Sequence, residues 1–241
     1  MSRTRISTLL ISALLLAGTS AAQASNFTVS VEAPTVQSTT TNFTNGGTEN
    51  FNNATSLNFS TTLGSYNVTY AASNGAGIGT NYTYGGAGGS GQYATTNNGS
   101  YSLTITNGSA DYFGVWISAL NSPNDLAFYN NGVLVQNLDT AALSSLLGSN
   151  ASSYYGNPNN GQDAGEMFFY ANFYDTVGTF NQVVFSGAGF ESDNQTLGTY
   201  ANTTGTTLVT GTAVPEPASL ALLGAGLFGL GAMRRRAKTT A

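Results

Sequence analysis

Positively charged side chains are confined to the two ends of this 241-residue chain. Arg3 and Arg5 lie at one end, a basic cluster from Arg234 to Lys238 lies at the other, and no Lys, Arg or His occurs between Arg5 and Arg234. All eleven acidic residues fall in that interval, and the chain has no cysteine. A fold built from this interval therefore has neither salt bridges between side chains nor disulfides, and apolar packing and hydrogen bonds must hold it together.

The missing residue types exclude several classes of function. Nucleic-acid binding requires cations against phosphate. P-loop and Schiff-base chemistry require a lysine, Ser-His and Cys-His nucleophiles require a histidine, and the usual zinc sites require His or Cys. Carboxylates, hydroxyls, amides and aromatic rings remain. We therefore predict no nucleic-acid partner, and we expect a protein that is not an enzyme.

The first 24 residues have the three parts of a secretory signal peptide. The two arginines form the positive region, residues 6–17 are mostly Leu, Ile and Ala, and Ala22-Gln23-Ala24 supplies a small-residue cleavage site. The sequence thus predicts a signal helix over residues 1–24 and a mature chain that begins near Ser25. The alternative interpretation is a short N-terminal helix of the folded domain.

Residues 214–241 contain a second apolar segment, followed by a basic end. Residues 218–233 carry no charge. As a helix they would span about 24 Å, which is short for a hydrocarbon core of about 30 Å. The basic run Arg234-Arg235-Arg236 is expected to act as a stop-transfer signal and to stay on the cytoplasmic side. We predict a transmembrane helix over 218–233 with the main domain outside, and a buried core helix is the alternative.

This C-terminal arrangement resembles the PEP-CTERM sorting signal of exosortase-dependent bacterial surface proteins. The resemblance rests on Val214-Pro215-Glu216-Pro217, on the short apolar segment and on the terminal arginines. It implies a Gram-negative bacterium, an inner-membrane-anchored precursor, and export by the secretion machinery. It further implies processing by an exosortase and delivery to the outer cell surface or the medium. The resemblance concerns sorting and not activity, because unrelated domains carry the same tail.

Residues 25–213 have the size of one all-β domain. Apolar and polar residues alternate in runs such as 27–31 and 66–70, and turns rich in Gly, Asn and Ser separate the runs. Eight or more such strands with one short helix predict a β-sandwich of jelly-roll type. An up-and-down barrel is the alternative.

Four segments carry more specific signals. Residues 112–119 are almost entirely apolar, which favours a strand buried on both faces. Asn131-Gly132 suits the type I′ turn of a tight hairpin. Asp139 is placed to cap a short helix. Residues 74–100 are rich in glycine, and we expect a long flexible surface loop there.

Oxygen-bearing side chains form two clusters that could hold Ca²⁺, a cation that takes about six to eight oxygen ligands. Carboxylates without an internal cation repel one another, and a divalent ion would relieve the repulsion. Neither cluster has the spacing of an EF-hand, and the alternative is turn residues with local hydrogen bonds. The candidate ligand or Ca²⁺-binding residues are Asn157, Asn159, Asp163 and Glu166 in the first cluster, and Glu191 and Asp193 in the second.

Carbohydrate binding is the second candidate chemistry, because sugars pack on aromatic faces while amide and carboxylate groups bind their hydroxyls. We expect Trp116 in the core, and Tyr154 and Tyr155 as a candidate exposed platform. An enzyme would have to be a glycoside hydrolase with two carboxylates, for which Glu166 and Glu191 would be the pair. We predict a non-catalytic surface or matrix protein associated with exopolysaccharide. The alternatives are that hydrolase or a Ca²⁺-dependent carbohydrate-binding module.

Overall fold

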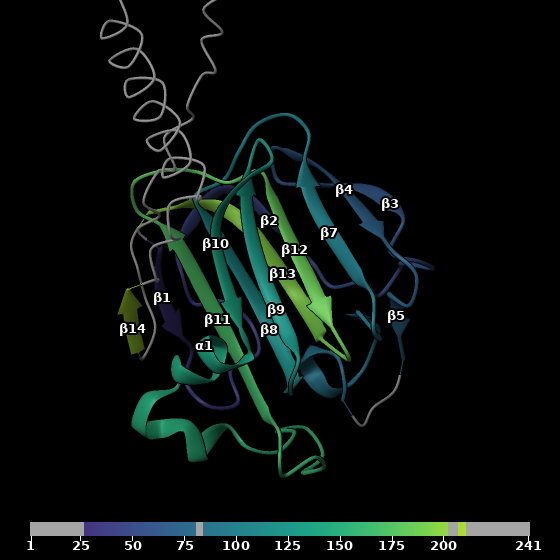
Figure 1. The fold of residues 1–241 in the computed structure, drawn as a ribbon, viewed down its shortest axis with the longest axis vertical. Coiled ribbons are helices and arrows are strands. Elements are labelled where there is room, and N and C mark those ends of the chain that lie inside the picture. Colours follow the sequence, from purple (N-terminus) through teal and green to yellow (C-terminus); the bar gives the residue numbers. More distant parts are fainter. Residues whose placement is uncertain (1–26, 81–83, 202–206, 211–241) are drawn as a thin grey trace, which may run out of the picture.

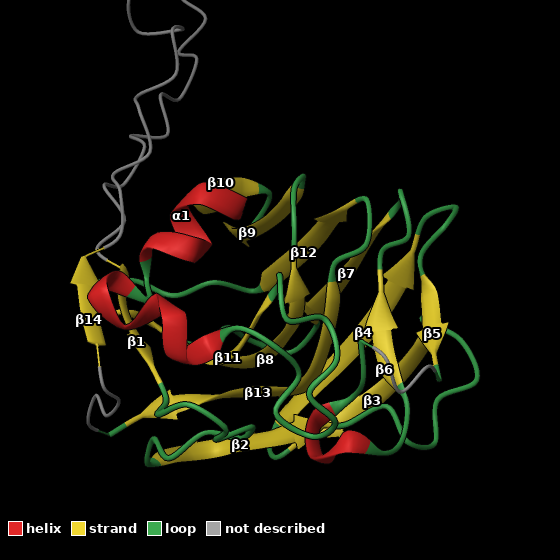
Figure 2. Cartoon of the chain, turned by 90° about the horizontal axis from the view of Figure 1, so that it is seen from below, coloured by secondary structure: helices red, strands yellow, loops and turns green. Residues whose placement is uncertain are grey.

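Two antiparallel β-sheets packed face to face make up the folded part of the chain (Figures 1 and 2). The structure, a computed structural model, describes residues 27–80, 84–201 and 207–210. Sheet A has eight strands in the order β14-β1-β11-β8-β13-β6-β5, and β2 is also paired with β13. Sheet B has six strands in the order β10-β9-β12-β7-β4-β3.

In the described ranges the strands are three to ten residues long, and three helical segments connect some of them. Sheet A comprises β1 (Phe27–Val31), β2 (Phe43–Glu49), β5 (Gly77–Gly79), β6 (Tyr93–Thr95), β8 (Tyr112–Leu120), β11 (Met167–Asp175), β13 (Glu191–Tyr200) and β14 (Thr207–Thr210). Sheet B comprises β3 (Phe59–Leu63), β4 (Tyr66–Ala72), β7 (Ser100–Ile105), β9 (Asn124–Asn130), β10 (Val133–Asp139) and β12 (Gln182–Gly187). The helical segments are η1 (Ala87–Gly89), α1 (Thr140–Ser145) and η2 (Gly148–Tyr154).

The main apolar core lies between the sheets and is rich in aromatic rings. Phe113 on β8 contacts Phe128 on β9 and Phe185 on β12, with ring centroids 5.9 and 6.1 Å apart. All three side chains are fully buried. Because burial of one such ring stabilises a fold by about 1.5–3 kcal/mol, these rings can replace the ion pairs that the sequence lacks.

The outer side of sheet A carries a second, smaller apolar cluster. It consists of Trp116, Ala119, Phe168 and Tyr170, and Ala87 of η1 packs against it. As a result every residue of β8 is buried. The predicted burial of this strand on both faces is therefore confirmed, as is the expected core position of Trp116.

The strand β13 lies in the middle of sheet A although its sequence is mostly polar. Ser192 and Gln195 are fully buried, and their side chains meet tyrosines of sheet B. Gln195 Nε2 donates to the Tyr101 hydroxyl at 2.6 Å, and the Tyr70 hydroxyl donates to Gln195 Oε1 at 3.1 Å. The hydroxyls of Tyr101 and Ser192 are also hydrogen-bonded. These bonds allow a polar strand to be buried, because each partner compensates the other for lost water.

The architecture confirms the predicted β-sandwich at the level of two packed antiparallel sheets. An up-and-down barrel does not describe it, because most neighbours in sheet A are not consecutive in the chain. The jelly-roll connectivity stays a prediction. The hairpin between β9 and β10 is confirmed, with positive φ at Asn131 and Gly132. The helix cap is also confirmed, since Asp139 accepts from the Ala142 backbone N–H at 2.8 Å.

The expectation of a flexible surface loop over residues 74–100 is wrong. This segment contains β5, η1 and β6, and the two strands extend sheet A. Tyr93, Ala94 and Thr96 are buried. The prediction took the glycines as a sign of flexibility. Here they instead allow the backbone to approach other groups closely. A Cβ at Gly86 would lie 2.8 Å from a carboxylate oxygen of Asp193.

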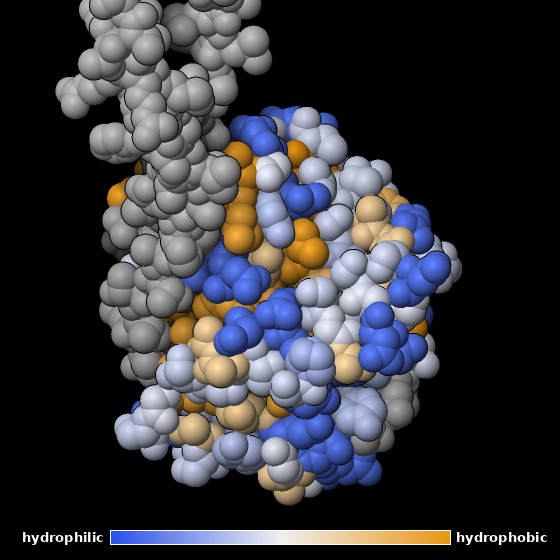
Figure 3. All heavy atoms as spheres, viewed as in Figure 1, coloured by the Kyte–Doolittle hydropathy of each residue, from blue (hydrophilic) through white to orange (hydrophobic). Residues whose placement is uncertain are grey.

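The visible outer surface is mostly hydrophilic, with apolar residues gathered in part of the face shown in Figure 3. Val133 and Leu134 of β10 are 45% and 36% exposed. They belong to the edge strand of sheet B, where scattered apolar exposure is ordinary.

Replacing Tyr101 by phenylalanine is expected to lower the free energy of unfolding by about 1–3 kcal/mol. The change removes the hydroxyl that Ser192 and Gln195 share, and leaves polar groups buried with fewer partners. Tyr155→Phe is the matched control, because that ring is 46% exposed. Urea unfolding measured by the fluorescence of the single tryptophan would show the difference, and equal stability of the two variants would contradict this role of the network.

Candidate functional site

A polar pocket of about 370 Å³ opens where β6, β13 and the segments after β8 and β12 meet. We call it the Glu191 pocket. Its wall includes two tyrosines, two amides, one threonine and one carboxylate. These groups belong to Tyr84, Tyr93, Thr95, Asn97, Asn121 and Glu191.

Glu191 lies at the start of β13 and is only 9% exposed. Its Oε1 atom accepts a long hydrogen bond of 3.4 Å from the Thr95 hydroxyl, and its Oε2 atom has no hydrogen-bond partner. Burial, together with the charges of Glu166 and Asp163, raises the pKa of this carboxyl to about 8, against hydrogen bonds that lower it. The carboxyl is thus poised between its two protonation states near neutral pH.

Strand pairing brings Glu191 and Glu166 to the same end of sheet A. β11 begins directly after Glu166 and pairs with the end of β8, directly before Asn121. Asn121 Nδ2 accordingly donates to Glu166 Oε1 at 3.4 Å. On the other side of β8, Ser118 pairs with Glu191. Glu166 and Glu191, which belong to two clusters that were predicted separately, therefore lie at the same end of sheet A.

The loop 155–166 presents Asp163 and Glu166. Its ends are joined by the Gly156 N–H, which donates to the Glu166 carbonyl at 2.9 Å. Asp163 has a φ of 51°, and its carbonyl accepts from the Glu166 N–H at 2.9 Å, which makes a tight turn. Asp tolerates this left-handed conformation better than most residues. The turn fixes the two carboxylates three positions apart at the mouth of β11.

Buried oxygens without a hydrogen-bond partner occur on Asn124 and on four further residues of the described ranges, which we call the carboxylate cluster. They are Asn121, Asp163, Glu166 and Glu191. In the described ranges of the chain, no three acidic side chains lie close enough together to form a ready-made metal centre. Glu166 and Glu191, with the Asn121 amide beside Glu166, form the centre of the cluster, and Asp163 adds negative charge from the loop.

Asp193 has a different environment, although it is only two residues from Glu191. It is buried, and its two oxygens accept from the backbone N–H groups of Ala87 and Asn194, at 2.8 and 2.7 Å. Burial raises the pKa of Asp193 to about 7, against these hydrogen bonds. Its carboxylate thereby fixes η1 on the outer side of sheet A.

Asn157 and Asn159 stabilise loops. Asn157 is buried, and its Oδ1 accepts from the Asn159 N–H at 3.0 Å. The Asn159 amide exchanges two hydrogen bonds with the amide of Gln37, at 2.8 and 3.2 Å. Because Gln37 Oε1 also accepts from the Gly88 N–H, this contact joins three loops.

The candidate aromatic platform is only half present. Tyr155 is 46% exposed, but Tyr154 is 4% exposed, so its predicted exposure is wrong. The Tyr154 hydroxyl donates to the Glu32 carbonyl at 2.8 Å, and its ring packs edge-on against Phe169. An apolar position next to the main core explains this burial.

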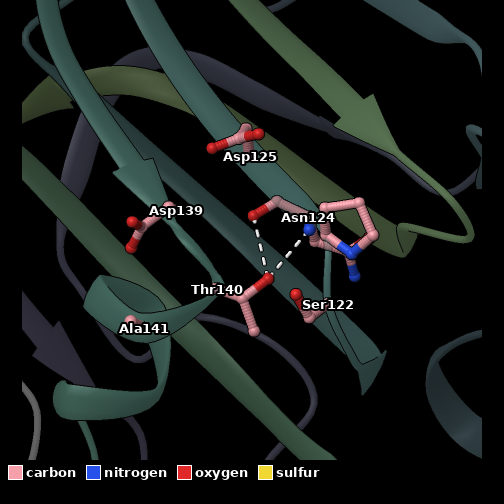
Figure 4. Close-up of a pocket in the computed structure, with 7 residues that line it drawn as sticks. Ser122, Asn124, Asp125, Asp139, Thr140 and Ala141 are labelled. Atoms are coloured by element: carbon pink, nitrogen blue, oxygen red, sulfur yellow. Dashed lines mark hydrogen bonds between the residues drawn. The ribbon is translucent and has the colours of Figure 1, made fainter.

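A second pocket of about 260 Å³ lies between β9 and the start of α1 (Figure 4). Asp125 and Asp139 are directly opposite each other on paired strands. The Thr140 hydroxyl accepts from the Asn124 N–H at 2.8 Å and donates to the Asn124 carbonyl at 3.1 Å. One of the two carboxylates in this pocket, that of Asp139, already has a structural role, because it caps α1.

Sequence reasoning did not identify Tyr84, Asn97 or Asn121 as pocket residues. Tyr84 and Asn97 fall in the glycine-rich segment that was expected to be flexible. Asn121 directly follows a buried strand, and a polar residue at such a strand end was the available signal.

A match to a family model indicates how the protein is sorted. Residues 213–236 match the family model of the PEP-CTERM protein-sorting motif. The chain carries a PEP-CTERM motif. This PEP-CTERM motif implies exosortase-dependent export and sorting to the cell surface of a Gram-negative bacterium. Neither a curated protein nor a solved structure matches the chain significantly.

The PEP-CTERM motif and the predicted signal peptide lie outside the described residues. This applies to the predicted helices over 1–24 and 218–233 and to the predicted cleavage sites. Among the residues that the structure does describe, no helix is long and apolar enough to span a bilayer.

The pKa values of Glu191 and Asp193 predict that the protein is more stable in mild acid than above neutral pH. Burial raises these pKa values from 4.5 to about 8 and from 3.8 to about 7. Between those limits the folded state holds protons that the unfolded state has lost, so the free energy of unfolding falls as pH rises, by about 1.4 kcal/mol per pH unit for each proton. The stabilisation is complete below about pH 4 and lost above about pH 8. Urea unfolding across this range, in buffer with a chelator, measures the slope. Glu191→Gln should flatten it, and a slope of zero in the natural protein would contradict the prediction.

Proposed function

We propose that this protein is a non-catalytic, exosortase-processed surface or matrix protein whose exported domain, residues 25–213, retains exopolysaccharide. In this proposal the signal peptide directs export and the helix over 218–233 anchors the precursor in the inner membrane. The exosortase then releases or transfers the domain. The PEP-CTERM motif supports the sorting part of the proposal.

The observation that carries the binding part is the chemistry of the Glu191 pocket. Tyr84 contributes a ring that is 37% exposed, and amides and a carboxylate line the same pocket. A ring for the face of a sugar, beside groups that donate and accept hydrogen bonds, is a suitable combination for a glycan. Because every charged side chain of the domain is a carboxylate, the glycan that we propose is neutral.

Tyr84→Ala is expected to weaken binding of exopolysaccharide purified from the producing bacterium by about tenfold, which corresponds to about 1.4 kcal/mol. The reason is the loss of the exposed ring from the pocket. Affinity electrophoresis of the natural protein and the variant measures the change. The matched control is Tyr155→Ala, which removes an exposed ring outside the pocket. If both variants retained full binding, the pocket would not be the glycan site.

A glycoside hydrolase is the second candidate, and one observation favours it. The charge of Glu166 helps to raise the pKa of Glu191, and a raised pKa suits a general acid. Glu166→Gln and Glu191→Gln separate the two functions. Release of reducing sugar by the natural protein that disappears in both variants would establish the hydrolase, whereas retention without turnover supports the binding protein.

Deleting the exosortase is expected to leave a larger precursor that fractionates with the inner membrane. The uncleaved chain would retain residues 214–241 and the apolar segment within them. Immunoblots of membrane and surface fractions test this, with a soluble periplasmic protein as the control. A mature protein of unchanged size and location would show that the exosortase does not process this chain.

A further inference from the structure

Buried polar atoms without a hydrogen-bond partner gather at one place in the part of the chain that the structure describes. In all the described residues, six carry such atoms, and four of these six form the carboxylate cluster. In these four the unpartnered atoms are all oxygens: Asn121 Oδ1, Asp163 Oδ2, Glu166 Oε2 and Glu191 Oε2. Native structures rarely leave buried polar groups unsatisfied, so this concentration requires an explanation.

A cation is one partner that could satisfy all four of these oxygens. Carboxylate oxygens only accept hydrogen bonds when ionised, and the amide oxygen of Asn121 only accepts. No Lys, Arg or His lies between Arg5 and Arg234, so no side chain of the domain can supply positive charge. Glu191, which is nine-tenths buried, sits in the wall of the Glu191 pocket together with Asn121. An ion entering through this pocket would reach both.

We propose that the carboxylate cluster binds a calcium ion through Glu166, Glu191 and Asn121. Their unpartnered oxygens supply the ligands, Asp163 adds negative charge from the loop 155–166, and water completes the coordination. Calcium fits better than magnesium, because it accepts irregular sets of oxygens from flexible side chains, whereas magnesium requires a near-ideal octahedron. The small number of carboxylates corresponds to an extracellular type of site, with a Kd of about 10⁻⁴–10⁻³ M.

Bound calcium would join three segments that are distant in the sequence. Asn121 follows β8, Glu166 ends the loop 155–166, and Glu191 begins β13. The ion would thereby stabilise the end of sheet A at which the Glu191 pocket opens. This inference goes beyond the proposed glycan binding and does not depend on it.

The test uses the full chain, purified in mild detergent and freed of metal with EDTA. Saturating CaCl₂ is expected to raise the Tm by about 5 °C, and MgCl₂ at the same concentration by much less. Terbium, a luminescent substitute for calcium, should show emission sensitised by the tyrosines of the pocket, and calcium should displace it. No change in Tm and no terbium emission would overturn the proposal.

Four variants locate the ion. Glu191→Gln and Glu166→Gln should each reduce calcium affinity at least tenfold, yet fold normally in EDTA because they remove mutual repulsion. Asp125→Asn, which changes a carboxylate in the second pocket, should keep the full response. Tyr84→Ala should keep the rise in Tm even if it loses glycan. A full response in both Glu variants would place the ion elsewhere and overturn the assignment.

Discussion

Negative charge without any compensating side chain is the constraint on which the rest of this structure depends. The fold neutralises most of its carboxylates with backbone and side-chain donors. Glu32 accepts from the Thr40 N–H and from the Asn172 amide, both at 2.8 Å, and Asp175 accepts from the Gly178 N–H at 2.8 Å. Charge-assisted hydrogen bonds of this kind are about twice as strong as neutral ones. Glu166 and Glu191 lack such donors for their second oxygens, which is why chemistry is expected there.

Hydrophobic patterning predicted the apolar strands and the sandwich, but it could not predict the strand at the centre of sheet A. β13 is buried because Ser192 and Gln195 find partners on Tyr101 and Tyr70, which belong to the opposite sheet. No local pattern contains that information. The prediction of a flexible loop over residues 74–100 failed for a related reason. The order of this segment comes from long-range contacts such as the hydrogen bond from the Ala87 N–H to Asp193.

The residue types of the candidate site were predictable, but their convergence was not. The composition leaves carboxylates and amides as the groups available for chemistry. On that basis Asp163, Glu166 and Glu191 were predicted as candidate site residues. That the charges of Glu166 and Asp163 act on Glu191 depends on β8 lying between β11 and β13, a matter of strand order. Asp193 has a different role from Glu191. Its carboxylate accepts hydrogen bonds from the backbone N–H groups of Ala87 in η1 and of Asn194.

The cation-free interval also determines which proteases can degrade the exported domain. Proteases of trypsin specificity hold a lysine or arginine in a pocket with a carboxylate at its base. The exposed loops of this sandwich, including the loop 155–166, offer them no such residue. Proteases of trypsin specificity therefore have no cleavage site in the exported domain, which has no disulfides to reinforce it outside the cell.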